Sequence, residues 1–225
     1  MKKMRFEITT TFGKAKAWLY AMFVEHNFIN PIRYNFHKIS SGVYRSSQPT
    51  MTQLERDVKK YNIKTILNLK GPNLNSAYYA FEVEKCKELG IKLVDIEIYS
   101  RSIPDAQKIK KAKEIFEEIE YPMWMHCKAG SDRTGLYATL FQYFYLKMPI
   151  KDTNQLSLIP FGHLKHSKAG KIDYYFEEFA KYQDSHPDVD LLFWAENIAD
   201  RDKMDKEFKP EGLSNFINEY ILMRE

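Results

Sequence analysis

The chain has 225 residues, of which 44% are hydrophobic and 28% are charged, and its formal net charge is +4. These values are ordinary for a globular protein, and without a long block of Lys or Arg they give no indication of nucleic acid binding. Two cysteines, Cys86 and Cys127, are too few for a disulfide framework, so a reducing compartment and a cytoplasmic location are expected. The mild positive charge suits an anionic substrate.

Residues 1–34 are predicted to form an N-terminal helical extension. The start, Met1-Lys2-Lys3, resembles a secretory signal, but the apolar region and the cleavage site that should follow are missing, so a signal is rejected. No stretch approaches the roughly 18 apolar residues of a membrane-spanning helix. The segment 15–28 is interpreted as a packed helix, and an amphipathic helix that touches a membrane surface is the alternative.

Short apolar runs then alternate with helical patterns. The predicted strands cover residues 42–45, 64–69, 91–98 and 122–126. The predicted helices cover residues 51–61, 76–89 and 103–120, and a strongly apolar helix follows residues 130–135 and runs to 146. Gly90 is expected at a helix C-cap and Pro104 in the first turn of a helix. The alternation predicts an α/β fold with a mostly parallel central sheet of about four to five strands and helices on both faces.

After Pro149 the pattern is helical again. The helical stretches cover residues 152–158, 169–185 and two segments within 188–225 that are divided near Lys209-Pro210. The whole pattern predicts three parts. They are the N-terminal extension over residues 1–34, a central domain over residues 35–186, and a C-terminal helical extension, packed on that domain, over residues 187–225.

One loop carries residues suited to chemistry on phosphate. Its sequence is His126-Cys127-Lys128-Ala129-Gly130-Ser131-Asp132-Arg133-Thr134-Gly135. A loop between a strand end and a helix N-terminus can turn its backbone N–H groups inward, and the helix dipole adds positive potential, so residues 128–133 are predicted to bind a phosphoryl group. Gly130 allows a tight backbone turn. The same field is expected to lower the pKa of Cys127 to roughly 3.5 to 7.5 and make it a nucleophile.

The other residues of the loop have complementary roles. Arg133, six residues after Cys127, can fork onto two phosphate oxygens. Thr134 places a hydroxyl where it can help the sulfur leave in a second step. His126 is expected to orient the cysteine through backbone contacts without touching the substrate.

This pattern resembles the protein tyrosine and dual-specificity phosphatase superfamily. A wider likeness to a group of bacterial dual-specificity-type phosphatases rests on residues 43–49, 65–71 and 155–163, and spans roughly residues 35–185. The resemblance implies that Cys127 attacks phosphorus to form a phosphocysteine, which water then hydrolyses. It implies no metal and no cofactor, and a phosphorylated protein or a small phosphorylated molecule as substrate.

The general acid is less evident. In many relatives an aspartate about thirty residues before the cysteine protonates the leaving oxygen, but Ser100 or Arg101 stands at that place here. Asp105 lies on the same loop, at a helix start where a carboxylate is ordinary. Asp132, inside the catalytic loop, is the second candidate, because some relatives such as myotubularin-type lipid phosphatases are thought to use that position. A water molecule, or a leaving group that needs no proton, stays open.

Several basic residues fall near the predicted site. Lys128 either binds a second phosphate, as in phosphoinositide-active relatives, or is a solvated lysine at the mouth. Arg45, Lys70 and Arg101 lie at predicted strand ends or loops on the active edge, where together they could hold a polyanion, although each alone is expected to be structural.

Two residues outside the loop have structural expectations only. Cys86 is predicted to be buried rather than disulfide-bonded to Cys127. His163 has no assigned role beyond capping or packing.

The leading functional hypothesis is a phosphatase that acts on phosphotyrosine, with phosphoserine and phosphothreonine as further substrates. The first alternative is a phosphatase of inositol phosphates or phosphoinositides, suggested by Lys128, Asp132 and the basic loops. The second is an inactive module that binds phosphorylated ligands. A rhodanese-type sulfur transferase is disfavoured, because Arg133-Thr134-Gly135 is not its pattern.

Overall fold

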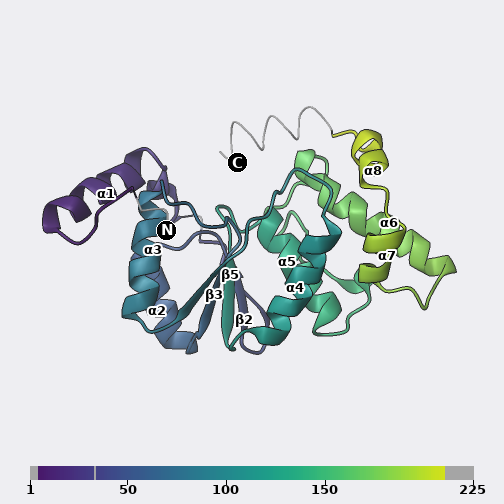
Figure 1. Ribbon diagram of the computed structural model, residues 1–225, viewed down its shortest axis with the longest axis horizontal. Coiled ribbons are helices and arrows are strands. Elements are labelled where there is room, and N and C mark those ends of the chain that lie inside the picture. The colour runs from purple at the N-terminus through teal and green to yellow at the C-terminus, as the bar shows by residue number, and fades with distance from the viewer. Residues whose placement is uncertain (1–4, 33, 211–225) are drawn as a thin grey trace. The chain divides into compact units, whose positions relative to one another are not determined.

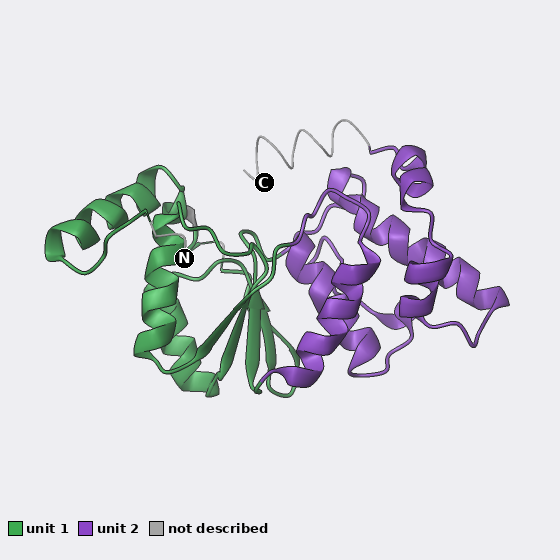
Figure 2. Ribbon diagram, in the orientation of Figure 1, with its two compact units in different colours: residues 1–97, 120–130 green, residues 98–119, 131–225 purple. Residues whose placement is uncertain are grey.

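The computed structural model describes residues 5–32 and 34–210, with only the backbone described at Ile29. The chain forms two compact units (Figures 1 and 2). Unit 1 comprises residues 1–97 and 120–130, and unit 2 comprises residues 98–119 and 131–225. Unit 1 holds the β-sheet, whereas the described part of unit 2 is helical (Figure 2).

Unit 1 is built on a five-stranded sheet with the order β1-β2-β5-β3-β4. Its strands are β1 (His37–Ser40), β2 (Val43–Ser46), β3 (Thr65–Asn68), β4 (Lys92–Asp95) and β5 (Met123–His126). The pairs β2·β5, β5·β3 and β3·β4 are parallel, which confirms the predicted α/β class and its mostly parallel sheet. Strand β1 pairs antiparallel with β2 and was not predicted, because Ile39 is its only apolar residue.

Parallel pairing brings the carboxyl ends of the inner strands to one edge of the sheet. Ser46 on β2 and Asn68 on β3 are both in register with His126 on β5. The segments that follow these residues therefore leave the sheet together, as the sequence predicts for the turn after β3 and for the loop that begins at Cys127.

The helices of unit 1 begin and end where their capping residues stand. They are α1 (Thr11–Phe23), α2 (Met51–Tyr61) and α3 (Ala77–Glu88), with the 3-10 turn η1 (Asn27–Ile29). Thr50 and Gln53 form a capping box at the start of α2. The Ser76 hydroxyl accepts a hydrogen bond from the Tyr79 N–H at the start of α3. Gly90, with a φ of 67°, stands just beyond α3, as predicted.

Helix α1 packs on unit 1 through small residues. Its buried residues Ala17 and Ala21 cluster with Ala77. After α1, the carboxylate of Glu25 accepts hydrogen bonds from the N–H groups of Ala77 and Tyr78 at 2.7 and 3.0 Å. The segment after α1 thereby satisfies the start of α3, so the packed N-terminal helix that the sequence predicts is present.

Aromatic side chains form much of the core of unit 1. Phe36 stacks with Tyr44 and Tyr61 at ring distances of 5.6 and 5.4 Å, and meets Trp124 edge to face at 5.3 Å. Trp124 is fully buried, and its Nε1–H donates to Ser46 Oγ at 2.7 Å. In this unit the aromatic side chains serve core packing.

The described part of unit 2 is a set of packed helices. They are α4 (Ala106–Glu118), α5 (Asp132–Phe144), α6 (Lys171–Ser185), α7 (Leu191–Asn197) and α8 (Arg201–Glu207), with the 3-10 turns η2 (Ile150–Asp152) and η3 (Lys168–Gly170). Trp194 on α7 packs against Tyr175 and Phe179 on α6 at ring distances of 5.0 and 5.5 Å. The segment after residue 187 therefore packs on the helix before it, as far as it is described.

Two predicted features of unit 2 are wrong. Pro104 lies outside α4 rather than in its first turn, because Asp105 is the N-cap and its Oδ1 accepts from the Gln107 N–H at 2.8 Å. Residues 152–158 do not form a helix beyond η2. There the Asn154 N–H donates to the side chain of Gln142 instead of to a helical carbonyl.

Other bounds differ by less. The strand predicted over residues 91–98 is limited to β4, and a further break at residues 198–200 divides the first helical stretch predicted after residue 187 into α7 and α8. Helix α8 ends at Glu207, just before the predicted break near Lys209-Pro210. The predicted helical segment after that point falls on residues 211–225, outside the described residues. The three-part division of the chain stays a prediction. In residues 5–32 and 34–210, no helix combines the length and apolar character needed to cross a membrane.

Candidate functional site

The predicted catalytic loop starts at the end of β5. Cys127 is buried and belongs to unit 1 with the loop residues up to Gly130. The backbone of the preceding residue, His126, is held in place, because its carbonyl accepts a hydrogen bond from the Leu69 N–H at 2.9 Å. The backbone entering Cys127 is therefore fixed by β3.

The His126 side chain is held by a buried carboxylate. Its Nε2 lies 2.7 Å from Oε1 of Glu82 on α3, and both side chains are at most 1% exposed. Glu82 also accepts a hydrogen bond from Tyr78 Oη at 3.3 Å. Glu82, which no sequence pattern indicated, lies against the His126 ring, and the orienting role of His126 stays a prediction.

Three consecutive carbonyl groups of the loop accept hydrogen bonds from other segments of unit 1. The pairs are Gln48 N–H with Lys128 O (3.2 Å), Asn35 Nδ2 with Ala129 O (3.1 Å) and Arg45 Nη2 with Gly130 O (2.7 Å). Because C=O and N–H point in opposite directions across a trans peptide, these contacts turn the following N–H groups to the other side of the loop. The Gly130 N–H accordingly meets Cys127 Sγ at 3.3 Å. A backbone N–H directed at the sulfur in this way is the arrangement that an anion-binding nest uses.

Gly130 is a loop position where a side chain cannot fit. Its φ is +73°, and a Cβ would lie 2.5 Å from Ser47 N and 2.6 Å from Ser46 C. The close approach of the loop to the end of β2 is what allows Arg45 to reach the Gly130 carbonyl. The glycine is therefore required both for its φ and for the space it leaves.

Gln48 connects the loop to two other segments. Its N–H holds the Lys128 carbonyl, its Oε1 accepts from Lys70 Nζ at 2.7 Å, and its Nε2 donates to Asn27 Oδ1 at 2.9 Å. Gln48 is 2% exposed, so these contacts are shielded from water. The sequence resemblance included this residue without assigning it a role.

Two of the predicted basic residues of unit 1 contact other residues of the protein. Arg45 is fully buried against the loop, and Lys70 contacts Gln48. Lys128 is half-buried. Arg101, which the prediction placed with them, belongs to unit 2 and is also half-buried. The structure thus gives Arg45 and Lys70 positioning contacts within unit 1.

The second half of the loop motif opens helix α5 in unit 2. Ser131 is fully buried, and its hydroxyl donates to the carbonyl of Phe161 at 2.7 Å. Asp132 is the first residue of α5, and Arg133, next to it, is half-buried. The Thr134 hydroxyl is buried and has no hydrogen-bond partner within the described part of the chain. An orphaned buried hydroxyl fits a residue whose partner is present only during a reaction.

Asp132 is joined to two residues far along the sequence. His163 Nδ1 lies 2.7 Å from Asp132 Oδ1, and His163 Nε2 lies 2.6 Å from Asp173 Oδ2. Burial alone would lower the pKa of His163, but its hydrogen bonds to both aspartates and their negative charges outweigh burial and raise that pKa to about 9. The sequence indicated His163 without a role and gave no signal for Asp173.

Asp105, the other candidate acid, is engaged at both oxygens. Oδ1 caps α4 through the Gln107 N–H, and Oδ2 accepts from Arg201 Nη1 at 2.9 Å. Arg201 also donates to the carbonyl of Ile103 at 3.0 Å. These contacts tie the start of α4 to α8.

Both cysteines carry free thiols. Cys86 is buried in α3, as predicted, and burial raises the pKa of its thiol far above the ordinary range. Among the residues that the structure describes, no group of three or more His, Cys, Asp or Glu side chains is arranged to hold a metal ion.

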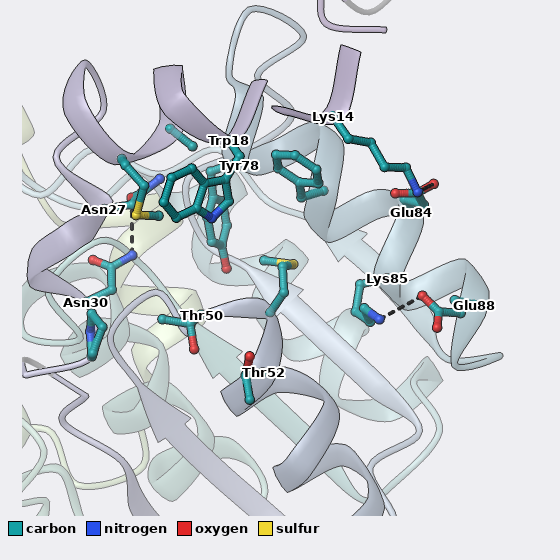
Figure 3. A pocket seen from close by; sticks show the side chains of 15 residues that line it. Lys14, Trp18, Asn27, Asn30, Thr50, Thr52, Tyr78, Glu84, Lys85 and Glu88 are labelled. Atoms are coloured by element: carbon teal, nitrogen blue, oxygen red, sulfur yellow. Dashed lines mark hydrogen bonds and ion pairs between the residues drawn. The ribbon is translucent and has the colours of Figure 1, made fainter. Parts of the chain in front are cut away.

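A separate cavity of about 560 Å³ lies in unit 1 among α1, η1, α2 and α3 (Figure 3). Its wall includes Trp18 and Tyr78, and Asn30 Nδ2 donates to Asn27 Oδ1 at 3.1 Å at its polar side. Asn27 is the residue that Gln48 contacts, so the cavity wall and the loop scaffold share one hydrogen-bond network.

A family model described as "DSP-PTPase phosphatase fused to NAD+ Kinase" matches residues 33–169, which is more than half of the chain. The match includes the whole loop from His126 to Gly135. No curated protein matches the chain.

The fold is similar to those of solved phosphatases. TpbA from P. aeruginosa has a TM-score of 0.52 and 16% identity, over 77% of this chain and 89% of that chain. A putative phosphatase from Shewanella putrefaciens CN-32 has a TM-score of 0.53 and 15% identity, over 68% and 95%. The core catalytic domain of the PP-IP phosphatase SIW14 from S. cerevisiae is 25% identical with a TM-score of 0.47, over 67% and 93%. The first two establish a shared fold.

Replacing Gly130 with Ala should destabilise the protein by about 2 kcal/mol or more, because the new Cβ meets backbone atoms at a positive φ. Gly90→Ala is the matched control, since Gly90 has a φ of +67° but no atom within 4 Å of an added Cβ. That variant should lose only the strain of the backbone conformation, about 1 kcal/mol. Urea unfolding of both variants measures the difference, and equal losses would contradict the close packing at Gly130.

The raised pKa of His163 predicts a loss of stability in alkaline solution. Its contribution is fully present below the unfolded pKa of about 6.5 and is lost as the pH rises through about 9. One proton changes stability by up to about 1.4 kcal/mol per pH unit. Urea midpoints of the wild type should therefore fall between pH 7 and 9 more steeply than those of His163→Asn. Parallel curves would show that His163 is not protonated in the folded state.

Proposed function

The chain belongs to the family of DSP-PTPase phosphatases fused to NAD+ kinase, and we propose that it hydrolyses phosphotyrosine through a phosphocysteine intermediate. Membership of the family makes the chain a phosphatase. The substrate and the roles of the residues are the proposal. The observation that carries it is the row of three loop carbonyls held by Gln48, Asn35 and Arg45, with the Gly130 N–H directed at Cys127 Sγ.

In the first step, Cys127 Sγ attacks phosphorus. The S–P bond forms while the bond from phosphorus to the leaving oxygen breaks, and that oxygen takes a proton from a general acid. The loop N–H groups of residues 128–133 and the guanidinium of Arg133 stabilise the three equatorial oxygens as charge develops on them.

In the second step, water attacks the phosphocysteine and gives a proton to the carboxylate that the general acid became in the first step. The S–P bond breaks, the sulfur leaves as a thiolate, and inorganic phosphate is released. Thr134 donates its otherwise unpartnered hydroxyl to the leaving sulfur, which would explain why that hydroxyl is buried without a partner among the described residues.

We assign the general acid to Asp132 in preference to Asp105. Both Asp105 oxygens are occupied by the α4 cap and by Arg201. Asp132 lies within the catalytic motif itself, five residues after Cys127, so it needs no mobile loop to reach the leaving group. Ser100 and Arg101 provide no acid at the position that relatives use.

Phosphotyrosine is favoured over inositol phosphates because the basic residues of unit 1 near the loop contact other residues of the protein. A substrate with several phosphates needs several cations around the site, but Arg45 is fully buried against Gly130 and Lys70 contacts Gln48. Lys128 is the remaining unit 1 candidate for a second phosphate. A single phosphoryl group therefore suits this scaffold best. We also place the protein in a reducing, cytoplasmic compartment, which suits two free thiols.

The proposal is tested with a panel of phosphotyrosine, phosphoserine and phosphothreonine peptides, inositol phosphates and phosphoinositides. Phosphate release should be fastest from the phosphotyrosine peptides. Cys127→Ser should lower release to background, since the thiolate nucleophile is lost. Cys86→Ser is the matched control, because it removes the other buried cysteine and should leave the relative rates unchanged. Faster release from inositol phosphates would overturn the substrate, and an active Cys127→Ser would overturn the mechanism.

A further inference from the structure

Asp132, His163 and Asp173 form a buried chain within unit 2. His163 is 1% exposed, Asp132 is 7% and Asp173 is 9% exposed. The two carboxylates approach opposite nitrogens of the same ring, at 2.7 and 2.6 Å. The three side chains come from α5, from the irregular segment before η3 and from α6, so the tertiary fold alone brings them together.

The two nitrogens of the His163 ring limit how protons can be placed between Asp132 and Asp173. A neutral imidazole has one N–H and one lone pair, so it can donate to only one of the two carboxylates. Only the imidazolium donates to both. Asp173 favours that form, because it lies in the first turn of α6, where the helix dipole stabilises a negative charge.

The position of the ring is fixed independently of its charge. The His163 N–H donates to the carbonyl of Ser157 at 3.0 Å, and the Gly162 N–H donates to the carbonyl of Leu158 at 2.7 Å. Gly162 has a φ of 74°, the left-handed conformation that favours glycine. The segment from 157 to 163 is thereby folded into a turn that presents the imidazole to α5.

We propose that His163, held by Asp173, is a positioning residue that fixes Oδ1 of Asp132 and stabilises the carboxylate left when Asp132 protonates the leaving oxygen. In the donor state the transferred proton is on Oδ2, and Oδ1 accepts from His163 Nδ1–H. The Oδ2–H bond breaks as the new O–H bond forms on the leaving group. The negative charge that remains on Asp132 is then paired with the imidazolium, which keeps both of its protons.

The charged groups next to Asp132, His163 and Asp173 come from α5, α6 and the segment before η3. Asp132 and Asp173 are the groups that act on His163. Lys165, from the same segment, pairs with Glu177 on α6 and also feels the charge of Asp173. Arg133 follows Asp132 on α5 and is assigned to the phosphate. The His163 ring is in direct contact with Asp132 Oδ1.

The inference rests on the proposed role of Asp132, and the experiment separates the two. Profiles of kcat/KM against pH are recorded with p-nitrophenyl phosphate and with phenyl phosphate, whose leaving group needs a proton more. Asp132→Asn should abolish the fall in rate on the basic side. If that fall is unchanged in Asp132→Asn, the acid assigned in the proposed function is wrong, whatever His163 does.

With the acid role established, His163→Asn and Asp173→Asn test the positioning role. Each should move the basic limb to higher pH by about one unit or more, because the cation that favours ionised Asp132 is lost or neutralised. Each should also slow phenyl phosphate by about tenfold, and p-nitrophenyl phosphate less. Asp57→Asn is the control, since Asp57 is a buried carboxylate of α2 that contacts Tyr34 and Arg56, and its removal should leave the limb in place.

A purely structural role would lower the rates at all pH values and for both substrates alike without moving the limb, and that result would overturn the proposal. If either variant fails to fold, the wild type provides a second readout. NMR of protein with 15N-labelled histidine should show both ring nitrogens of His163 protonated at pH 7. A single protonated nitrogen at that pH would overturn the proposal as well.

Discussion

The site of unit 1 depends on one constraint: the loop carbonyls of residues 128–130 are bound from behind by the end of β2 and by Asn35. Each of these hydrogen bonds is local and modest, about 1 kcal/mol in net stability. Their direction matters more than their strength, because the peptide whose carbonyl Asn35 holds directs the Gly130 N–H at the sulfur of Cys127. An anion site built this way is preorganised, so little reorganisation accompanies charge development during a reaction.

This constraint explains the burial of Arg45, the need for glycine at position 130 and the contacts of Gln48. Arg45 is fully buried because its target is a carbonyl of the loop, and Gly130 is required because the loop must approach the backbone of Ser46 and Ser47. Gln48 extends the same network to Lys70 and, through Asn27, to the turn after α1. The N-terminal segment therefore supports the scaffold that orders the loop. In unit 2, Asp132 is likewise held by a distant segment, since His163 contacts its Oδ1 and is itself held by Asp173.

Local patterns made much of the fold predictable. Helix α2 has the bounds predicted for it, residues 51–61, and the apolar run after Pro122 predicted β5 and the loop that follows. Long-range contacts were not predictable, because Asp173 lies more than forty residues after Cys127 and nothing in its neighbourhood marks it. Edge strand β1 lacks the apolar pattern that a buried strand shows. The inward orientation of the Arg45 side chain was also not predictable. A basic residue at an active edge suggests a contact with substrate as readily as a buried contact with the protein.

The central claim is that scaffold contacts to the loop carbonyls create the anion site, and calorimetric titration with tungstate tests it most directly. The parent is Cys127→Ser, and the comparison is the same protein with Arg45→Met, which keeps an unbranched apolar stem but removes the donor to Gly130. Circular dichroism confirms that both are folded. The dissociation constant for tungstate should rise about tenfold or more in the double variant, equivalent to about 1.4 kcal/mol. Equal affinities would contradict the account.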